Sequence, residues 1–206
     1  AKKVFPNANI VVDKFHIVQL LTRELNKLRI NEMKKLNTRS REYKILKRYW
    51  KIPLRKKREL NSIYFYKNIH FKNMTSSVDI LDYMLKEFPN LKEAYDFYQN
   101  FLLSISNNDV AMLEDILNTR TDEIPMCFRK SIKSLKKLRK YVVNSLKYDY
   151  TNAMVEGKNN KIKVIKRVSY GYRSFRNFKA RIMLMERYKI QKGNIHSYQF
   201  AMDAAA

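Results

Sequence analysis

We predict a mostly α-helical protein from three properties of the sequence: its turn residues, its apolar content and its apolar periodicity. The 206 residues include three Gly and four Pro, too few for the tight turns of a many-stranded sandwich or barrel. An apolar fraction of 45% is enough to bury a core, which argues against a disordered chain. Apolar side chains recur mainly at spacings of three and four, so long helices are favoured.

Cysteine and hydropathy exclude several classes of protein. Cys127 is the one cysteine and the chain has three histidines, so neither a disulfide framework nor a zinc-ligand spacing is present in the sequence. No apolar run approaches the ~18 residues of a membrane span, and the first residues lack the apolar region of a signal peptide. We therefore expect a cytoplasmic protein without a membrane partner.

The net charge of +24 is distributed in blocks. Residues 1–72 carry 20 basic and 5 acidic side chains, residues 73–128 carry 3 and 10, and residues 129–192 carry 20 and 3. Two basic regions that meet on one polyanion, with the acidic block turned away, would explain this pattern. The alternative is that each basic helix simply keeps a solvated face.

The first predicted element is a buried strand at residues 10–12, which ends at Asp13. A helix follows at once, with an apolar stripe at Phe15, Val18, Leu21, Leu25 and Leu28. A carboxylate at the end of a buried strand lies where α/β sheets bind ligands. Asp13 is equally a good N-cap, and His16 could simply pack one turn into the helix.

Residues 37–150 are predicted to be helical throughout. The basic stretch 44–58 contains Pro53, so it is either a helix broken before this proline or a loop against nucleic acid. Apolar stripes at residues 78–88 and 91–105 predict two further helices. Asp109 should cap a helix over residues 110–117, and one long helix should follow Pro125, with its buried stripe running from Phe128 to Leu146.

Residues 151–168 form the most informative predicted helix. Thr151 or Asn152 would cap it, and Val155, Ile162, Ile165 and Val168 would form its buried stripe. Another face carries Glu156, Asn160, Lys163 and Arg167 at spacings of four, three and four. An ionised carboxylate among cations suits a Mg²⁺ ligand beside phosphate. An ordinary charge-paired helix face would have the same spacing.

The neighbouring glycines and the following segment add three expectations. Gly157 costs about 1 kcal/mol in a helix relative to Ala, which suggests that something passes close to it. Gly171 is placed as the residue just after the helix, at the C′ position. A second helix over residues 175–188 should pack back through Phe178, Ile182 and Met185.

Two blocks of residues resemble the transposases of the bacterial ISL-three insertion-sequence family. The first is Phe5-Pro6-Asn7-Ala8 followed by Val11-Val12-Asp13-Lys14-Phe15-His16-Ile17-Val18. The second runs from Thr151-Asn152-Ala153 through Glu156-Gly157-Lys158-Asn159-Asn160-Lys161-Ile162-Lys163 and Lys166-Arg167 to Tyr170-Gly171-Tyr172-Arg173-Ser174-Phe175. The resemblance covers nearly all of residues 5–190, and Thr151 stands where the family usually has Ser.

The resemblance implies a DDE recombinase with an RNase H-like core interrupted by a helical insertion. Glu156 would be the third catalytic acid and a ligand of Mg²⁺, while Asp13 and His16 match the family's Asp-x-x-His block, without an assigned role. Double-stranded DNA is the implied partner, and the family allows a homo-oligomer in a transposition complex. We assign DNA contacts to Lys158, Asn160, Lys161, Lys163, Lys166, Arg167 and Arg173.

The family's first two catalytic Asp would lie before Ala1, so we expect the C-terminal half of a DDE transposase that is catalytically incomplete and binds no Mg²⁺ tightly alone. The expected fold is mostly α, with a partial RNase H-like remnant of one or few strands. Its divisions are a core part at 1–36, a helical insertion at 37–150, the helix of the third acid with a basic helix at 151–192, and a tail at 193–206 that is vector-derived at its end. The alternative function is a non-catalytic, basic, helical nucleic-acid-binding protein.

The RNase H-like assignment also has a geometric consequence. If Asp13 and Glu156 border one site, the start of the first helix and the first turn of the Glu156 helix must be neighbours. Residues 37–150 would then be an excursion between them.

The charge blocks lead to a binding prediction. We expect the chain to bind duplex DNA with little sequence preference, and its affinity should fall steeply with salt because neutralised phosphates release counterions. Titration of a labelled duplex at two salt concentrations measures this dependence. An affinity that does not change with salt, or no binding at low salt, would contradict it.

Overall fold

The computed structural model describes residues 6–148 and 152–187, which belong to two compact units, residues 1–150 and residues 151–206. Helices account for most of the described residues, and the strands form one small two-stranded sheet. The predicted mostly α fold class is therefore confirmed.

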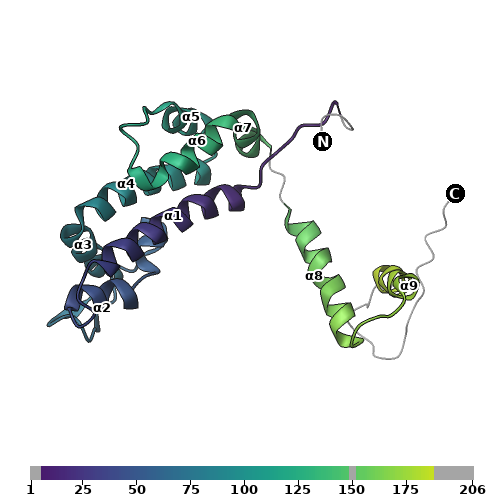
Figure 1. Ribbon diagram of the computed structural model, residues 1–206, viewed down its shortest axis with the longest axis horizontal. Helices are drawn as coiled ribbons and strands as arrows, with labels where there is room; N and C mark the ends of the chain where they lie inside the picture. The colour runs from purple at the N-terminus through teal and green to yellow at the C-terminus, as the bar shows by residue number, and fades with distance from the viewer. Residues whose placement is uncertain (1–5, 149–151, 188–206) are drawn as a thin grey trace. The chain divides into compact units, whose positions relative to one another are not determined.

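The first unit is built around α1 (Lys14–Lys34), which packs against α2, α4, α6 and α7 (Figure 1). Its buried residues follow each other at spacings of four: Ile17, Leu21, Leu25 and Arg29. The predicted stripe is correct at Leu21 and Leu25, but Phe15 is 62% exposed. Val18 and Leu28 are partly buried beside the core, because neighbouring helices cover α1 on more than one side.

The expected strand at residues 10–12 is wrong. The segment is irregular, and its polar backbone groups are satisfied by a helix instead of a second strand. The Val12 N–H donates to the Tyr141 carbonyl at 3.3 Å, and the Asn144 side chain donates to the Ile10 carbonyl at 3.0 Å. Apolar β-branched residues thus become a strand only where the fold supplies a neighbouring strand.

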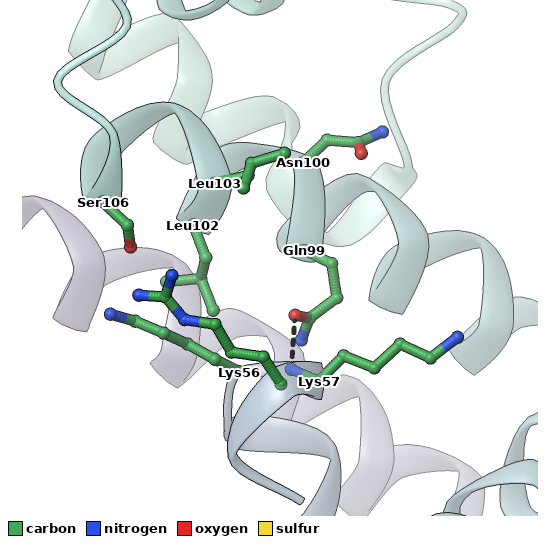
Figure 2. Close-up of a pocket in the computed structure, with 8 residues that line it drawn as sticks. Lys56, Lys57, Gln99, Asn100, Leu102, Leu103 and Ser106 are labelled. Atoms are coloured by element: carbon green, nitrogen blue, oxygen red, sulfur yellow. Dashed lines mark hydrogen bonds between the residues drawn. The ribbon is translucent and has the colours of Figure 1, made fainter.

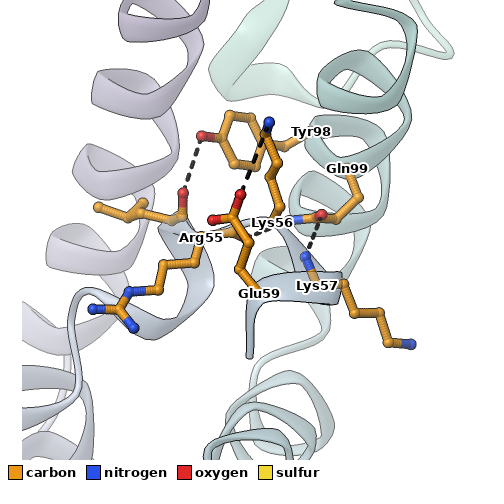
Figure 3. Close-up of polar contacts among 7 residues, drawn as sticks. Arg55, Lys56, Lys57, Glu59, Tyr98 and Gln99 are labelled. Atoms are coloured by element: carbon orange, nitrogen blue, oxygen red, sulfur yellow. Dashed lines mark hydrogen bonds and ion pairs between the residues drawn. The ribbon is translucent and has the colours of Figure 1, made fainter. Parts of the chain in front are cut away.

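The helix in the basic stretch after α1 ends before Pro53, which is one of the two predicted alternatives for residues 44–58. α2 (Arg41–Arg48) is followed by the short 3-10 helices η1 (Ile52–Leu54) and η2 (Lys57–Glu59), and Pro53 is buried in η1. Gln99 holds this segment, because its amide accepts from the Lys57 N–H at 3.0 Å and donates to the Arg55 carbonyl at 2.9 Å (Figure 3).

The middle helices begin and end largely as predicted. α3 (Ser77–Glu87) starts with a capping box between Ser76 and Asp79, and α4 (Pro89–Ser106) has its proline in the first turn. Asn108 has a φ of +55°, and the next N–H, that of Asp109, donates back to the Ser104 carbonyl at 2.9 Å. The Asp109 carboxylate also accepts from the Met112 N–H at 2.9 Å, so it caps α5 (Val110–Asn118) as predicted.

The single long helix expected after Pro125 is wrong, because the chain forms η3 (Met126–Phe128), α6 (Arg129–Lys137) and α7 (Arg139–Lys147). Leu138 separates α6 from α7 and is 43% exposed. Its N–H donates to the Leu135 carbonyl, while its own carbonyl accepts from the Tyr141 and Val142 N–H groups. One residue therefore ends one helix and begins the next, without glycine or proline.

The sequence analysis also missed a hairpin. β1 (Tyr66–Lys67) pairs antiparallel with β2 (Met74–Thr75). Buried Asn68 stabilises it by accepting from the Tyr49 hydroxyl at 3.0 Å and by contacting the Thr75 side chain.

The second unit contains α8 (Ala153–Val168) and α9 (Phe175–Arg187). Ser169 ends α8, so the C′ residue is Tyr170, with a φ of +52°, and Gly171, with a φ of +100°, follows it. The N–H groups of Tyr170 and Gly171 donate to the carbonyls of Arg167 and Lys166, both at 3.1 Å. This is a Schellman turn placed one residue earlier than predicted, so Gly171 is not the C′ residue.

Two buried tyrosines of α4 give a matched test of the core. The Tyr98 hydroxyl is shared with Thr22 at 2.8 Å and donates to the Leu54 carbonyl at 3.2 Å. The Tyr95 hydroxyl is buried and has no hydrogen-bond partner in the described part of the chain, and burial raises its pKa to about 12.

We expect Tyr98→Phe to lower the free energy of unfolding by about 1 kcal/mol, because two hydrogen bonds are lost. Tyr95→Phe should leave it unchanged or raise it by about 1 kcal/mol, because it removes a desolvated, unpaired hydroxyl. Urea denaturation followed by circular dichroism measures both. Equal destabilisation by the two substitutions would show that the Tyr95 hydroxyl is satisfied.

Candidate nucleic-acid interface

The α8 helix places Glu156, Asn160, Lys163 and Arg167 on one face, and all four side chains are exposed. Glu156 lies in the first turn, while Lys166 and Arg167 lie in the last turn. This arrangement suits the helix dipole, because the acid is near the positive N-terminal end and the bases are near the negative C-terminal end. The predicted alignment of one acid, one amide and two bases is therefore present.

The N-terminus of α8 differs from the prediction. Asn152 occupies the N-cap position with φ −77° and ψ −1°, and its side chain makes no capping hydrogen bond. Its carbonyl accepts from the Glu156 N–H at 2.9 Å, which is the first bond of the helix. The other predicted cap, Thr151, lies outside the described residues.

The Glu156 carboxylate has no ion-pair partner among residues 152–187 that the structure describes. In the described part of the chain, three ion pairs with i,i+3 spacing lie in the first unit: Lys27–Glu24 at 2.7 Å, Lys35–Glu32 at 2.8 Å and Lys56–Glu59 at 3.9 Å. An ordinary charge-paired helix would use its acid in this way. Glu156 is instead accessible to a cation or to another ligand from outside α8.

The apolar stripe predicted for α8 is mostly exposed. Only Ile165 is buried within α8, while Val155 and Val168 are 56% and 66% exposed. Of the predicted α9 contacts, Phe178 is half-buried and stacks at a tilt on Tyr172, 4.9 Å between ring centres, whereas Met185 is 41% exposed. A Cβ at Gly157 would meet no atom within 4 Å. Contrary to what the glycine suggested, no described residue of this unit therefore passes close to Gly157.

The seven residues assigned to DNA contacts do not share one face. At 100° per residue, Lys163 and Arg167 lie beside Glu156, whereas Lys158 and Lys161 lie on the side of buried Ile165. Lys161 Nζ donates to the Met185 carbonyl of α9 at 3.3 Å. Lys166 lies between the two sides of the helix. Arg173 follows the Schellman turn and is exposed.

Asp13 and His16 lie at the start of α1 in the first unit. The Asp13 carboxylate accepts from the Phe15 N–H at 2.7 Å, so Asp13 is the N-cap that one of the two hypotheses proposed. His16 is exposed, and its ring meets the edge of the Phe15 ring. Since Asp13 and Glu156 belong to different units, their expected proximity stays a prediction.

The carboxylates do not form a metal site within the described part of the chain. No group of three or more His, Cys, Asp or Glu side chains could hold a metal ion there. Mg²⁺ requires near-octahedral oxygen coordination, and a pair of Mg²⁺ ions requires several carboxylates. Glu156 alone does not fit a two-metal centre, so the residues described here do not hold one.

A pocket of about 230 Å³ lies between η2 and α4 (Figure 2). Two of its polar side chains are already engaged: Gln99 makes the two backbone bonds described above, and Lys56 lies 3.9 Å from Glu59. Cys127 is another group without a catalytic setting, because burial raises the pKa of its thiol to about 11. A nucleophilic cysteine requires the opposite shift.

Sequence analysis missed a more basic pocket of about 330 Å³ beside the β1–β2 hairpin. It is lined by Arg39, Arg41, Lys44, Ile69, His70, Phe71 and Lys72. The one signal in the sequence is that residues 60–78 contain neither Asp nor Glu. This signal does not indicate which other segment completes the pocket.

Comparison with known proteins identifies the family. The model of a transposase family, that of the ISL-three elements, matches residues 1–182. A Lactococcus lactis subsp. lactis protein named "ATP-dependent protease" is 39% identical over 121 residues, which cover 59% of this chain and 38% of that protein. No solved structure matches the chain. Among the described residues, no helix is sufficiently long and apolar to cross a membrane. Since the family model matches most of the sequence, the chain belongs to the ISL-three family of transposases.

Proposed function

We propose that this chain is the C-terminal part of a DDE transposase, in which Glu156 contributes one carboxylate to a metal centre and its helix face contacts DNA. The observation that carries the proposal is the exposed Glu156 carboxylate, which has no ion-pair partner among the described residues and lies on the same face as Lys163 and Arg167. A metal ligand must remain open to the metal. Cations beside it are suited to the phosphates on which a transposase acts.

The proposal includes catalytic incompleteness of the isolated chain. One carboxylate cannot hold two Mg²⁺ ions. The two further acids of the DDE triad would come from sequence preceding Ala1 in a longer parent protein. Alone, the chain would bind double-stranded DNA and would neither cleave nor join strands. In the complete protein it would act in a transposition complex in the cytoplasm, with Mg²⁺ as the cofactor.

The name of the Lactococcus relative, "ATP-dependent protease", does not lead us to propose ATP binding or proteolysis for this chain. The glycines of this chain stand at positions 157, 171 and 193. These spacings do not provide the two glycines of a phosphate-binding Walker A loop, which are five residues apart. The thiol of Cys127 is held protonated by burial. The alternative that we retain is a basic helical nucleic-acid-binding protein without catalysis.

Substitution of Glu156 separates the catalytic proposal from this alternative. In a parent protein that carries the two upstream acids, Glu156→Gln should abolish strand transfer and leave duplex affinity within about twofold, because it removes a metal ligand but no phosphate contact. Gel assays of strand joining and anisotropy titrations measure the two effects. Asp13→Asn is the matched control: Asn keeps the oxygen that accepts from the Phe15 N–H, so we expect both α1 and strand transfer to be retained.

For the isolated 206-residue chain, we expect neither Mg²⁺-dependent cleavage nor a tight Mg²⁺ site by calorimetry. Cleavage by this chain that is lost in its own Glu156→Gln variant would overturn the proposed incompleteness. Full strand transfer by the Glu156→Gln variant of the longer parent would instead favour the non-catalytic alternative for this helix.

Basic residues lie on two opposite sides of α8, so substitutions within this one helix can test which side contacts DNA. Lys163→Gln together with Arg167→Gln should reduce the slope of log affinity against log salt for a duplex by about 1.8, since each phosphate contact contributes about 0.9. Lys158→Gln removes the same kind of charge from the other side of α8 and should leave the slope nearly unchanged. Equal effects per charge from both sides would show that the Glu156 face is not the DNA-contacting face.

A further inference from the structure

The hairpin pocket of the first unit is basic and contains no carboxylate among its lining residues. Glu42 on α2 accepts a hydrogen bond from the Tyr83 hydroxyl at 3.3 Å and forms no ion pair with the described cations of the pocket. Arg39, Lys44 and Lys72 are exposed, and the described residues offer their side chains neither an ion pair nor a hydrogen bond. Three cations therefore remain available to an anion from outside.

The backbone around this pocket is held firmly. Arg41 Nε donates to the His70 carbonyl at 2.6 Å, and its guanidinium lies 5.1 Å from the centre of the Phe71 ring and 4.9 Å from that of Tyr83. Arg41 thus fastens the hairpin turn to α2. The pocket is preorganised, which reduces the entropic cost of binding a ligand.

The positive potential of the pocket acts on His70. Burial lowers the pKa of His70, and Arg48, Lys44 and Arg41 lower it further. Cations from α2 thus converge on the hairpin turn, which itself adds Lys72. Such a concentration of positive charge attracts phosphate groups.

The segment directly before β1, which leads into this hairpin, exposes apolar and aromatic side chains. Ile63, Tyr64 and Phe65 are 77%, 75% and 52% exposed. The backbone of Ile63 and Tyr64 is held in place, because the Asn61 side chain accepts from their N–H groups at 3.1 and 2.9 Å and donates to the Tyr64 carbonyl at 2.6 Å. Two neighbouring exposed aromatic rings are a surface on which a planar apolar group could stack.

We propose that this hairpin binds single-stranded DNA, with a phosphate in the pocket of Arg39, Lys44 and Lys72 and with bases stacked on Tyr64 and Phe65. A duplex would use the cations but hides the faces of its bases. An apolar protein partner would cover the rings but leave the cations unused. An unpaired strand uses both features. The site belongs to the first unit, the Glu156 face belongs to the second unit, and the proposal does not rest on the proposed function.

Replacement of the two rings tests the stacking. The double variant Tyr64→Ala, Phe65→Ala should bind a fluorescein-labelled oligothymidylate of about 12 nucleotides at least about tenfold more weakly, and duplex affinity should be unchanged. Ile63→Ala is the matched control, because it removes an equally exposed side chain without a ring, and it should leave both affinities unchanged. Thermal unfolding by circular dichroism verifies that the variants fold.

Replacement of the two lysines tests the phosphate pocket. Lys44→Gln with Lys72→Gln should reduce the salt slope for oligothymidylate by about 1.4, because a single-stranded phosphate contact contributes about 0.7. Lys133→Gln with Lys137→Gln on α6 makes the same charge change in the same unit and should leave this slope unchanged. Oligothymidylate binding should also raise the pKa of His70 in a proton NMR titration, with His70→Gln used to assign the signal.

Three outcomes would overturn the proposal: an unchanged oligothymidylate affinity in the ring variant, equal losses of single-strand and duplex binding, or loss of oligothymidylate binding in the Lys163→Gln, Arg167→Gln variant. In the last two cases the Glu156 face, and not the hairpin, would account for the binding. Self-association that disappears in the ring variant, without a change in oligothymidylate binding, would instead identify a surface for a second copy of the chain.

Discussion

The first unit depends on the buried row of α1, because helices from distant parts of the sequence pack against this one surface. Ile17, Leu21 and Leu25 are completely or almost completely buried. The fourth member, Arg29, places a cation in the row and donates from Nη1 to the Leu46 carbonyl at 2.7 Å, near the end of α2. Burial lowers the pKa of Arg29, yet a guanidinium remains charged and suits the negative end of a helix. Packing and one charged contact thereby fix α1 against α2.

The second unit is organised differently. α8 buries Ile165, and much of its remaining surface consists of charged groups and half-covered apolar side chains. A helix with so little buried area gains most of its stability from its end groups and from its neighbour α9. The Schellman turn is therefore important, because it satisfies two carbonyls of α8 and reverses the chain. It does so with Tyr170 in a conformation that costs a residue other than glycine about 1 kcal/mol.

Local signals in the sequence predicted local features well. Asp13 and Asp109 cap helices as their positions indicated, and the helix before Pro53 ends as one of the two alternatives for residues 44–58 proposed. The Glu156 face follows from helical periodicity alone. Features that depend on the neighbours of a segment could not be predicted in this way. Residues 10–12 have the composition of a strand but hydrogen-bond to α7, and the break at Leu138 occurs without glycine or proline. The hairpin pocket combines residues 39–44 with residues 69–72, which no short motif connects.

The burial of Cys127 has a consequence for the redox behaviour of the protein. Because partial burial raises the pKa of the Cys127 thiol to about 11, the thiol is predominantly protonated at neutral pH, and the thiolate is the form that oxidises and attacks disulfides. The native protein should therefore form disulfide-linked dimers only slowly in air. A cysteine introduced on the exposed face of α8 would be its one readily reactive thiol. Cross-linking chemistry directed at such a position would report contacts of that face without interference from the natural sulfhydryl.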